Sequence, residues 1–185
     1  NQVFLSIART TAVLLASLTH AASIYAVEVE FRELNIPEKV STMAMTPDHS
    51  LLLLAHHADD KISVWRTSDL SKVRDVECKS PRFILTRGDR IYVAHYESGL
   101  ISVFDREWKL VNQVRSGVNN LVHLAAPDEE YFSHKLIAVG WEERSDQKAT
   151  IVDLEQDENH LLIDEGGLQA VCLSNDGRVA YLSVR

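Results

Sequence analysis

Basic clusters are missing from this 185-residue sequence, whose formal net charge is -8. Nucleic-acid binders need a stripe of lysine and arginine facing the phosphates, so we expect no nucleic-acid partner. Two cysteines, Cys78 and Cys172, are too few for a disulfide framework, and we expect unpaired, mostly buried thiols. No apolar run reaches the roughly 20 residues that span a bilayer, so we expect no stable membrane insertion.

Motifs for known catalytic or cofactor chemistry are missing as well. The sequence has no nucleophile elbow, no phosphate-cradling glycine loop, no haem-attachment Cys-x-x-Cys-His and no helical His-Glu-x-x-His. After residue 30 there is no apolar period of helical spacing. We therefore expect an all-β chain, we assign no catalytic residue, metal ligand or cofactor, and we favour a non-catalytic protein over an enzyme.

What the sequence does contain is a repeat. In residues 90–105 apolar side chains recur with a period of two on either side of a Glu-Ser-Gly turn, which predicts a β-hairpin. A copy lies about 40 residues upstream, in Leu51–Trp65, and a looser copy spans residues 136–141 and 149–153. This spacing is typical of β-propeller blades.

The repeat predicts an all-β fold, a β-propeller with about three and a half four-stranded antiparallel blades. The expected blades cover residues 40–77, 80–114, 119–163 and 168–185. Turns of the same chemistry follow the first strands at Thr46-Pro-Asp, Ala126-Pro-Asp and Ser174-Asn-Asp-Gly, where the acidic side chain is expected to fold back onto its own backbone. A closed ring needs at least four blades, so we expect an incomplete ring from a longer protein.

The first 34 residues have a different pattern. Arg9 precedes the short apolar run 12–18, and small residues follow at 21–23, which is typical of a secretory signal peptide over residues 1–26. This pattern predicts export to the periplasm or the extracellular space, while a buried helix or early strand is the alternative. Residues 27–34 alternate charged and apolar side chains and are expected to form the outer strand of a preceding or closing blade.

Residues 91–105 resemble the YVTN-type β-propeller repeat, in which a Tyr-Val strand, a polar turn and a Val-Ser-Val strand follow one another. Leu173-Ser-Asn-Asp-Gly resembles the turn shared by YVTN, WD40-like and lactonase-type propellers. Two features depart from these patterns: His56 and His95 replace the usual asparagine, and Trp65 is followed by Arg66 instead of aspartate. The resemblance covers about residues 40–184 and implies a fold, not a function.

In such propellers the loops between second and third strands share one face with the blade connections, and ligands usually bind there. Aligning the repeats places His56, His95, Trp141 and Ser183 at one equivalent position, at the end of the second strand. The candidate ligand-binding residues of this channel face are His56, His57, His95, Arg82, Trp141 and Asn120.

Each candidate also has a structural interpretation. The cluster of His56, His57, Asp59 and Asp60 carries metal-binding groups, yet neighbouring strand residues point to opposite faces. The alternative is that His56 and His95 bond the backbone of a neighbouring blade while the aspartates cap a turn. Arg82, next to Pro81 at the inner edge of a blade, is the best candidate to contact an anion; the alternative is a solvated or backbone-bonded arginine.

These observations favour a non-catalytic, exported propeller that acts as a rigid scaffold for a protein or small-molecule ligand at the channel face. A lactonase-type sugar-acid hydrolase is one alternative, and it would need His57, His95 and Arg82 to converge in the channel. A redox propeller domain is the other.

Overall fold

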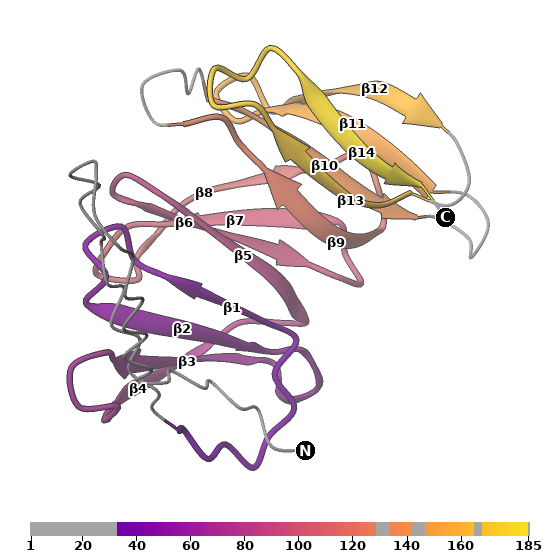
Figure 1. Ribbon diagram of the computed structural model, residues 1–185. Coiled ribbons are helices and arrows are strands. Elements are labelled where there is room, and N and C mark those ends of the chain that lie inside the picture. The colour runs from indigo at the N-terminus through magenta and orange to yellow at the C-terminus, as the bar shows by residue number, and fades with distance from the viewer. Residues whose placement is uncertain (1–32, 129–133, 142–146, 165–167, 185) are drawn as a thin grey trace, which may run out of the picture. The chain divides into compact units, whose positions relative to one another are not determined.

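The computed structural model describes residues 33–128, 134–141, 147–164 and 168–184 (Figure 1). The chain divides into two units, residues 1–38 and 39–185, and the fold described below is that of the second unit. The signal-like segment 1–26 lies outside the described residues, as does most of the expected strand 27–34. Of that strand only Glu33 and Leu34 are described, and both lie outside any strand.

The second unit consists of consecutive antiparallel sheets. The first sheet contains β1 (Thr42–Met45), β2 (Leu51–His56), β3 (Lys61–Arg66) and β4 (Lys72–Glu77). The second contains β5 (Pro81–Arg87), β6 (Arg90–His95), β7 (Leu100–Phe104) and β8 (Leu110–Arg115). The third contains β9 (Asn120–Ala125), β10 (Lys135–Trp141), β11 (Gln147–Asp153) and β12 (Glu158–Asp164). The last contains β13 (Leu168–Leu173) and β14 (Ala180–Val184).

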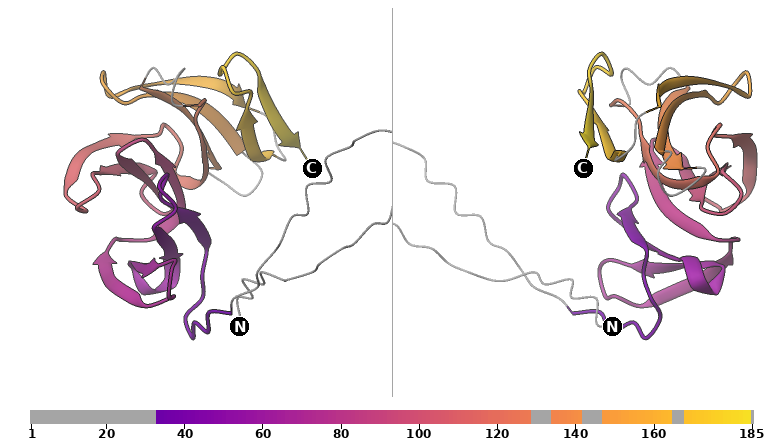
Figure 2. Two further views of the ribbon diagram at one scale, coloured as in Figure 1. Left: turned by 60° about the vertical axis from the view of Figure 1, so that its left-hand side comes forward. Right: turned by 90° about the vertical axis from the view of Figure 1, so that its right-hand side faces the viewer.

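The sheets pack as propeller blades. Their first strands β1, β5, β9 and β13 follow one another side by side, and the outer strands β4, β8 and β12 lie away from them (Figures 1 and 2). The described part of the chain thus holds three complete four-stranded blades and half of a fourth. The predicted all-β fold with about three and a half blades is confirmed.

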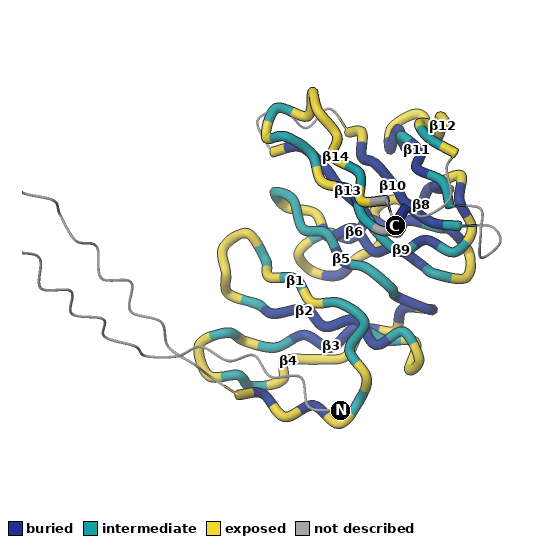
Figure 3. Tube along the Cα trace, turned by 45° about the vertical axis from the view of Figure 1, so that its right-hand side comes forward, coloured by how far each residue is buried: buried dark blue, intermediate teal, exposed yellow. Residues whose placement is uncertain are grey.

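Burial follows the order of strands in each blade (Figure 3). The second strand of each complete blade is an apolar run that is buried almost throughout. In the second and third blades neighbouring sheets cover both faces of this strand. The fourth strands β4 and β12 are mostly exposed and polar. Apolar side chains meet between neighbouring blades, as Ile62 and Val93 do between the first two and Ile101 and Leu136 between the next two.

The turn after the first strand repeats atom for atom in the first and last blades. In the first blade the hydroxyl of Thr46 donates to Asp48 Oδ1 at 2.6 Å, and the backbone N–H of Ser50 donates to the same oxygen at 3.1 Å. In the last blade Ser174 and Asp176 form the equivalent hydroxyl bond at 2.7 Å. The bonds in the first blade lower the pKa of Asp48 to about 2, with the Thr46 hydroxyl as the largest cause. The predicted aspartate turn is confirmed at both places.

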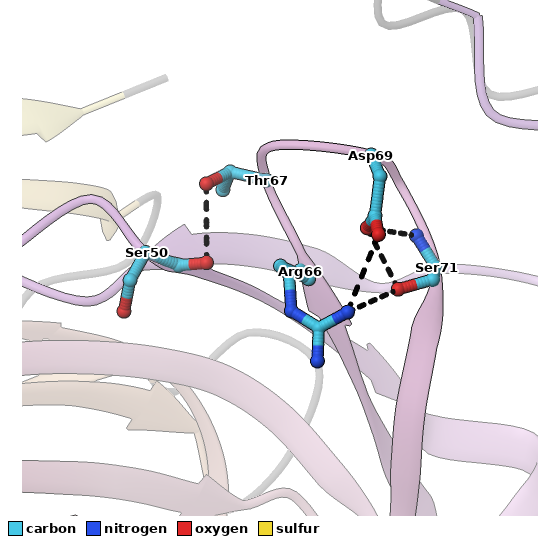
Figure 4. A network of polar contacts seen from close by, with 5 residues as sticks. All are labelled: Ser50, Arg66, Thr67, Asp69 and Ser71. Atoms are coloured by element: carbon cyan, nitrogen blue, oxygen red, sulfur yellow. Dashed lines mark hydrogen bonds and ion pairs between the residues drawn. The ribbon is translucent and has the colours of Figure 1, made fainter.

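A second polar network closes the hairpin between β3 and β4 (Figure 4). Asp69 Oδ1 accepts hydrogen bonds from the backbone N–H and the hydroxyl of Ser71, at 2.9 and 2.7 Å. The guanidinium of Arg66 spans the turn, with Asp69 Oδ2 at 3.3 Å and Ser71 Oγ at 2.9 Å. Thr67 Oγ1 donates to the carbonyl of Ser50 at 3.1 Å and so ties this hairpin to the turn after β1.

The two cysteines differ in environment. Both are free thiols, but Cys78 is buried and Cys172 is exposed on β13. The expectation of two mostly buried thiols is therefore wrong for Cys172. Within the described ranges, no helix is long and apolar enough to cross a membrane.

Candidate functional site

His56 and His95 both lie inside their sheets. Each is the last residue of a second strand and is buried, and each Nε2 lies 2.7 Å from a serine hydroxyl on the neighbouring third strand, Ser63 for His56 and Ser102 for His95. Trp65 Nε1 donates to the Ser63 hydroxyl at 2.8 Å. The pair of a histidine and a serine is thus a repeated feature of the first two blades.

The hydrogen bonds of His95 define which ring nitrogen carries the proton in the neutral side chain. Its Nδ1 contacts the carbonyl of Lys79, which can only accept, so Nδ1 carries the proton. In the neutral ring Nε2 then accepts the hydrogen of the Ser102 hydroxyl, and Gln113 Nε2 donates to Ser102 Oγ at 2.9 Å. Burial lowers the pKa of His95, and the bond to Lys79 opposes that shift. Both ring nitrogens are therefore engaged inside the protein, and His95 offers nothing to a ligand.

The sheet register corrects the alignment of the repeats. Leu54 pairs with Ser63 and Val93 with Ser102, so the histidine follows two residues after each pairing position. In the third blade Ala138 pairs with Thr150, and the equivalent position is therefore Gly140. Trp141 is equivalent to the residues after the histidines, which are His57 and Tyr96. The alignment of Trp141 with His56 and His95 was wrong by one residue.

Ser183 was misaligned by one residue in the opposite direction. It pairs with Ala170 across a register shift, as Ala94 pairs with Phe83 in the second blade. Ser183 is therefore equivalent to Ala94, one residue before the histidine position. A shift of one residue moves a side chain to the other face of a strand, so these corrections decide which groups reach the surface.

The residues after the histidine position form a ladder of rings across three blades, which we call the ring ladder: His57, Tyr96 and Trp141. The ring centroids of His57 and Tyr96 are 5.1 Å apart at an interplanar angle of 75°. Those of Tyr96 and Trp141 are 5.7 Å apart at 76°. All three side chains are half-buried, so each ring packs edge to face on its neighbour and leaves part of its surface in solvent.

Arg82 reaches the ring ladder because of a β-bulge. The pairing of β5 with β6 shifts register between Pro81 and Phe83, which leaves Arg82 without a partner position. A bulge re-aims the side chain of the extra residue. Here the guanidinium carbon of Arg82 lies 5.9 Å from the centre of the Tyr96 ring, within the range of a cation–π contact.

Polar contacts with the blade connections hold the ladder in place. Ser80 Oγ lies 3.0 Å from His57 Nδ1, and the backbone N–H of Tyr96 donates to the Ser80 carbonyl at 2.9 Å. Asn120 Nδ2 donates to the carbonyl of Trp141 at 2.8 Å. Asn120 thus supports the site through the backbone of the ladder residue.

Asp60 also has a structural role. It adopts a left-handed conformation with φ of 50°, and its Oδ1 accepts the backbone N–H of Ser80 at 2.7 Å. Gly99 occupies the equivalent position of the second blade with φ of 63°. There an added Cβ would lie 2.0 Å from the carbonyl oxygen of Val118, so this turn accepts only glycine.

The structure therefore divides the six predicted residues into groups. His57, Arg82 and Trp141 meet at the ring ladder and Asn120 supports it, whereas His56 and His95 are internal. Tyr96, the middle ring, was missed, although its position four residues before the start of the third strand matches that of His57. The arrangement can stack on apolar or planar groups and offers one guanidinium. Among the residues the structure describes, no three His, Cys, Asp or Glu side chains gather as a metal site.

No protein-family model matches this sequence, and neither does any curated protein. Solved structures do match its fold. Kuenenia stuttgartiensis hydrazine synthase superposes with a TM-score of 0.69 at 16% identity, over 85% of this chain and 46% of that one. The WD40 repeats of RRP9 and the structure of U3-55K superpose with TM-scores of 0.59 and 0.60, each at 13% identity over 76% of this chain and 44% of theirs.

These matches establish the fold as part of a WD40-like β-propeller. The chain spans less than half the length of the structures it matches. At such low identity the likeness concerns the fold alone, because one propeller architecture carries many unrelated functions.

Proposed function

We propose that this protein is a non-catalytic interaction scaffold that binds a segment of a partner protein on the ring ladder. The observation that carries the proposal is the juxtaposition of His57, Tyr96 and Trp141, one from each complete blade, with Arg82 against the middle ring. Tyrosine, tryptophan and arginine are the residues most enriched among binding hot spots. The β-propeller fold commonly serves as such a scaffold.

The way in which the backbone holds the ring ladder supports this role. The rings stand at strand ends whose backbones are bonded to the blade connections, so little side-chain or loop entropy is lost on binding. Asp59 and Glu97 lie just beyond the first two rings and are exposed. The proposed partner segment therefore places an apolar or aromatic side chain on the rings and a lysine or arginine beside these carboxylates.

A random-peptide phage library selected on the purified protein tests the proposal. We expect selected peptides to combine aromatic and basic residues and to lose at least tenfold in affinity on Tyr96→Ala, as measured by fluorescence polarisation. Leu110→Ala, which removes an exposed apolar side chain from β8, is the matched control and should leave affinity unchanged. Peptides that bind Tyr96→Ala and Arg82→Ala as tightly as the unaltered protein would overturn the proposal.

Export is a second part of the proposal, supported by the charge and the short apolar run of residues 1–26. Fusing residues 1–30 to an alkaline phosphatase that is active only outside the cytoplasm tests it. We expect phosphatase activity, and its loss when leucines 14 and 15 are replaced by arginine. An inactive fusion that is nevertheless made in full would refute export. The hydrolase alternative has no support from the site, because its required His95 is internal.

A further inference from the structure

A hollow lies at the strand ends opposite the ring ladder, between the second and third blades. Its volume is about 380 Å³, within the size range of small-molecule sites. The turn between β5 and β6 and the end of β11 form its rim, and the side chains of Val103 and Leu154 supply an apolar wall. Both side chains belong to the core between these blades, so the wall is rigid.

Two arginines and a phenol converge in this hollow. Arg87, Arg90 and Tyr92 all line it. Burial raises the pKa of Tyr92, and the positive charges of Arg90 and Arg87 act in the opposite direction. Asn112 also lines the hollow, and its amide bonds the Leu154 carbonyl at 2.7 Å across the blade interface.

The charges around the hollow leave arginine donors uncommitted. Of the two lining carboxylates, Asp89 pairs with Arg106 at 2.5 Å, and Glu155 lies 3.4 Å from His134 Nε2, a contact that is an ion pair only when the histidine is protonated. Arg87 donates through Nη2 to a backbone carbonyl at 2.9 Å and the same nitrogen lies 3.9 Å from Asp128 Oδ1, while its Nε is buried and has no acceptor among the described residues. The Arg90 side chain has no hydrogen bond or carboxylate partner within the described part of the chain.

We propose that this hollow binds a small organic anion, a carboxylate or phosphate on an apolar ring, with its charge on Arg87 and Arg90. A planar guanidinium presents paired N–H donors that match either group, and the apolar wall of Val103 and Leu154 receives the ring. The site shares no residue with the ring ladder and requires no partner protein.

Titration calorimetry with benzoate, phenyl phosphate and neutral benzyl alcohol tests the proposal. We expect saturable binding of at least one anion, weakened by salt, and none of the alcohol. The tighter of the two anions then identifies the headgroup. If neither anion binds, or if the alcohol binds as well as they do, the site is not an anion site and the proposal is wrong.

Variants locate the binding. Arg90→Gln should reduce anion affinity at least tenfold, because a charge-assisted bond is lost, and Arg90→Lys should recover only part of it. Arg74→Gln, at an exposed arginine of β4, is the matched control and should bind normally. Equal affinity in Arg90→Gln would overturn the assignment. Tyr96→Ala should also bind normally, so a failure of the ring ladder proposal is distinguished from a failure of this one.

Discussion

Replacing Ser102 by alanine would test the structural role assigned to His95. The Ser102 hydroxyl is buried, accepts a hydrogen bond from Gln113 and donates one to His95 Nε2. Gln113 is exposed, so its amide can turn to water when the hydroxyl is removed. Nε2 of His95 cannot, and it would remain a buried acceptor without a donor.

The expected loss of stability follows from this difference between Gln113, which can bond water instead, and His95, which cannot. Leaving one buried polar group unsatisfied costs about 1–3 kcal/mol, so we expect Ser102→Ala to lower the free energy of unfolding by about 2 kcal/mol. Ser98→Ala provides the control in the same hairpin, because Ser98 is exposed and only a weak 3.4 Å bond reaches its hydroxyl. It should stay within about 0.5 kcal/mol of the unaltered protein.

Urea unfolding followed by tryptophan fluorescence measures both variants. The midpoint should fall for Ser102→Ala at an unchanged slope, and peptide binding at the ring ladder should survive in the folded variant. If Ser102→Ala were as stable as Ser98→Ala, the hydrogen bonds of His95 would not contribute as argued. If it instead stayed stable and lost only ligand binding, His95 would belong to a functional site.

Three further predictions concern single residues. His49→Gly should stabilise the protein by about 0.5–1 kcal/mol in urea unfolding, because His49 holds φ of 58° where the last blade has Gly177; a destabilised variant would contradict this. In the folded protein the pKa of His95 is lowered from 6.5, so as the pH falls the unfolded chain takes up a proton on this residue before the folded protein does. The free energy of unfolding should therefore fall as the pH drops below about 6.5, by up to about 1.4 kcal/mol per pH unit. His95→Gln should reduce that slope without abolishing it, because burial lowers the pKa of His123 as well, and an unchanged slope would refute the assignment. In native protein the thiol reagent DTNB should modify Cys172 quickly and Cys78 only on unfolding, because Cys78 is buried and burial, chiefly, raises its pKa to about 12; two equally fast thiols would be the opposite result.

The strand and turn pattern of this protein could be predicted because it depends on local interactions. The apolar run 51–55 and the apolar residues of 61–65 favour extended strands that bury side chains, and the Thr46 and Asp48 side chains shape their turn with bonds to residues at most five positions away. The same holds for Ser174 and Asp176. Repeating this local chemistry about every 40 residues was enough to indicate blades.

The candidate site was predicted only in part because it depends on contacts between blades. His56 and His95 are candidates by residue type, yet hydrogen bonds to serines on the neighbouring strands keep both side chains inside the protein. The unremarked Tyr96 became the centre of the site because the rings of two other blades pack against it. The residues that flank Tyr96 in the sequence give no indication of those contacts.

By itself, then, the sequence determined which segments are strands, how each turn closes and that the strands group in fours. Only the tertiary structure decided which side chains face a neighbouring blade and which reach the rim. The physical reason is the two-residue period of a strand: one position separates His95, inside, from Tyr96, at the surface. That choice is made by pairing with strands that local sequence does not specify.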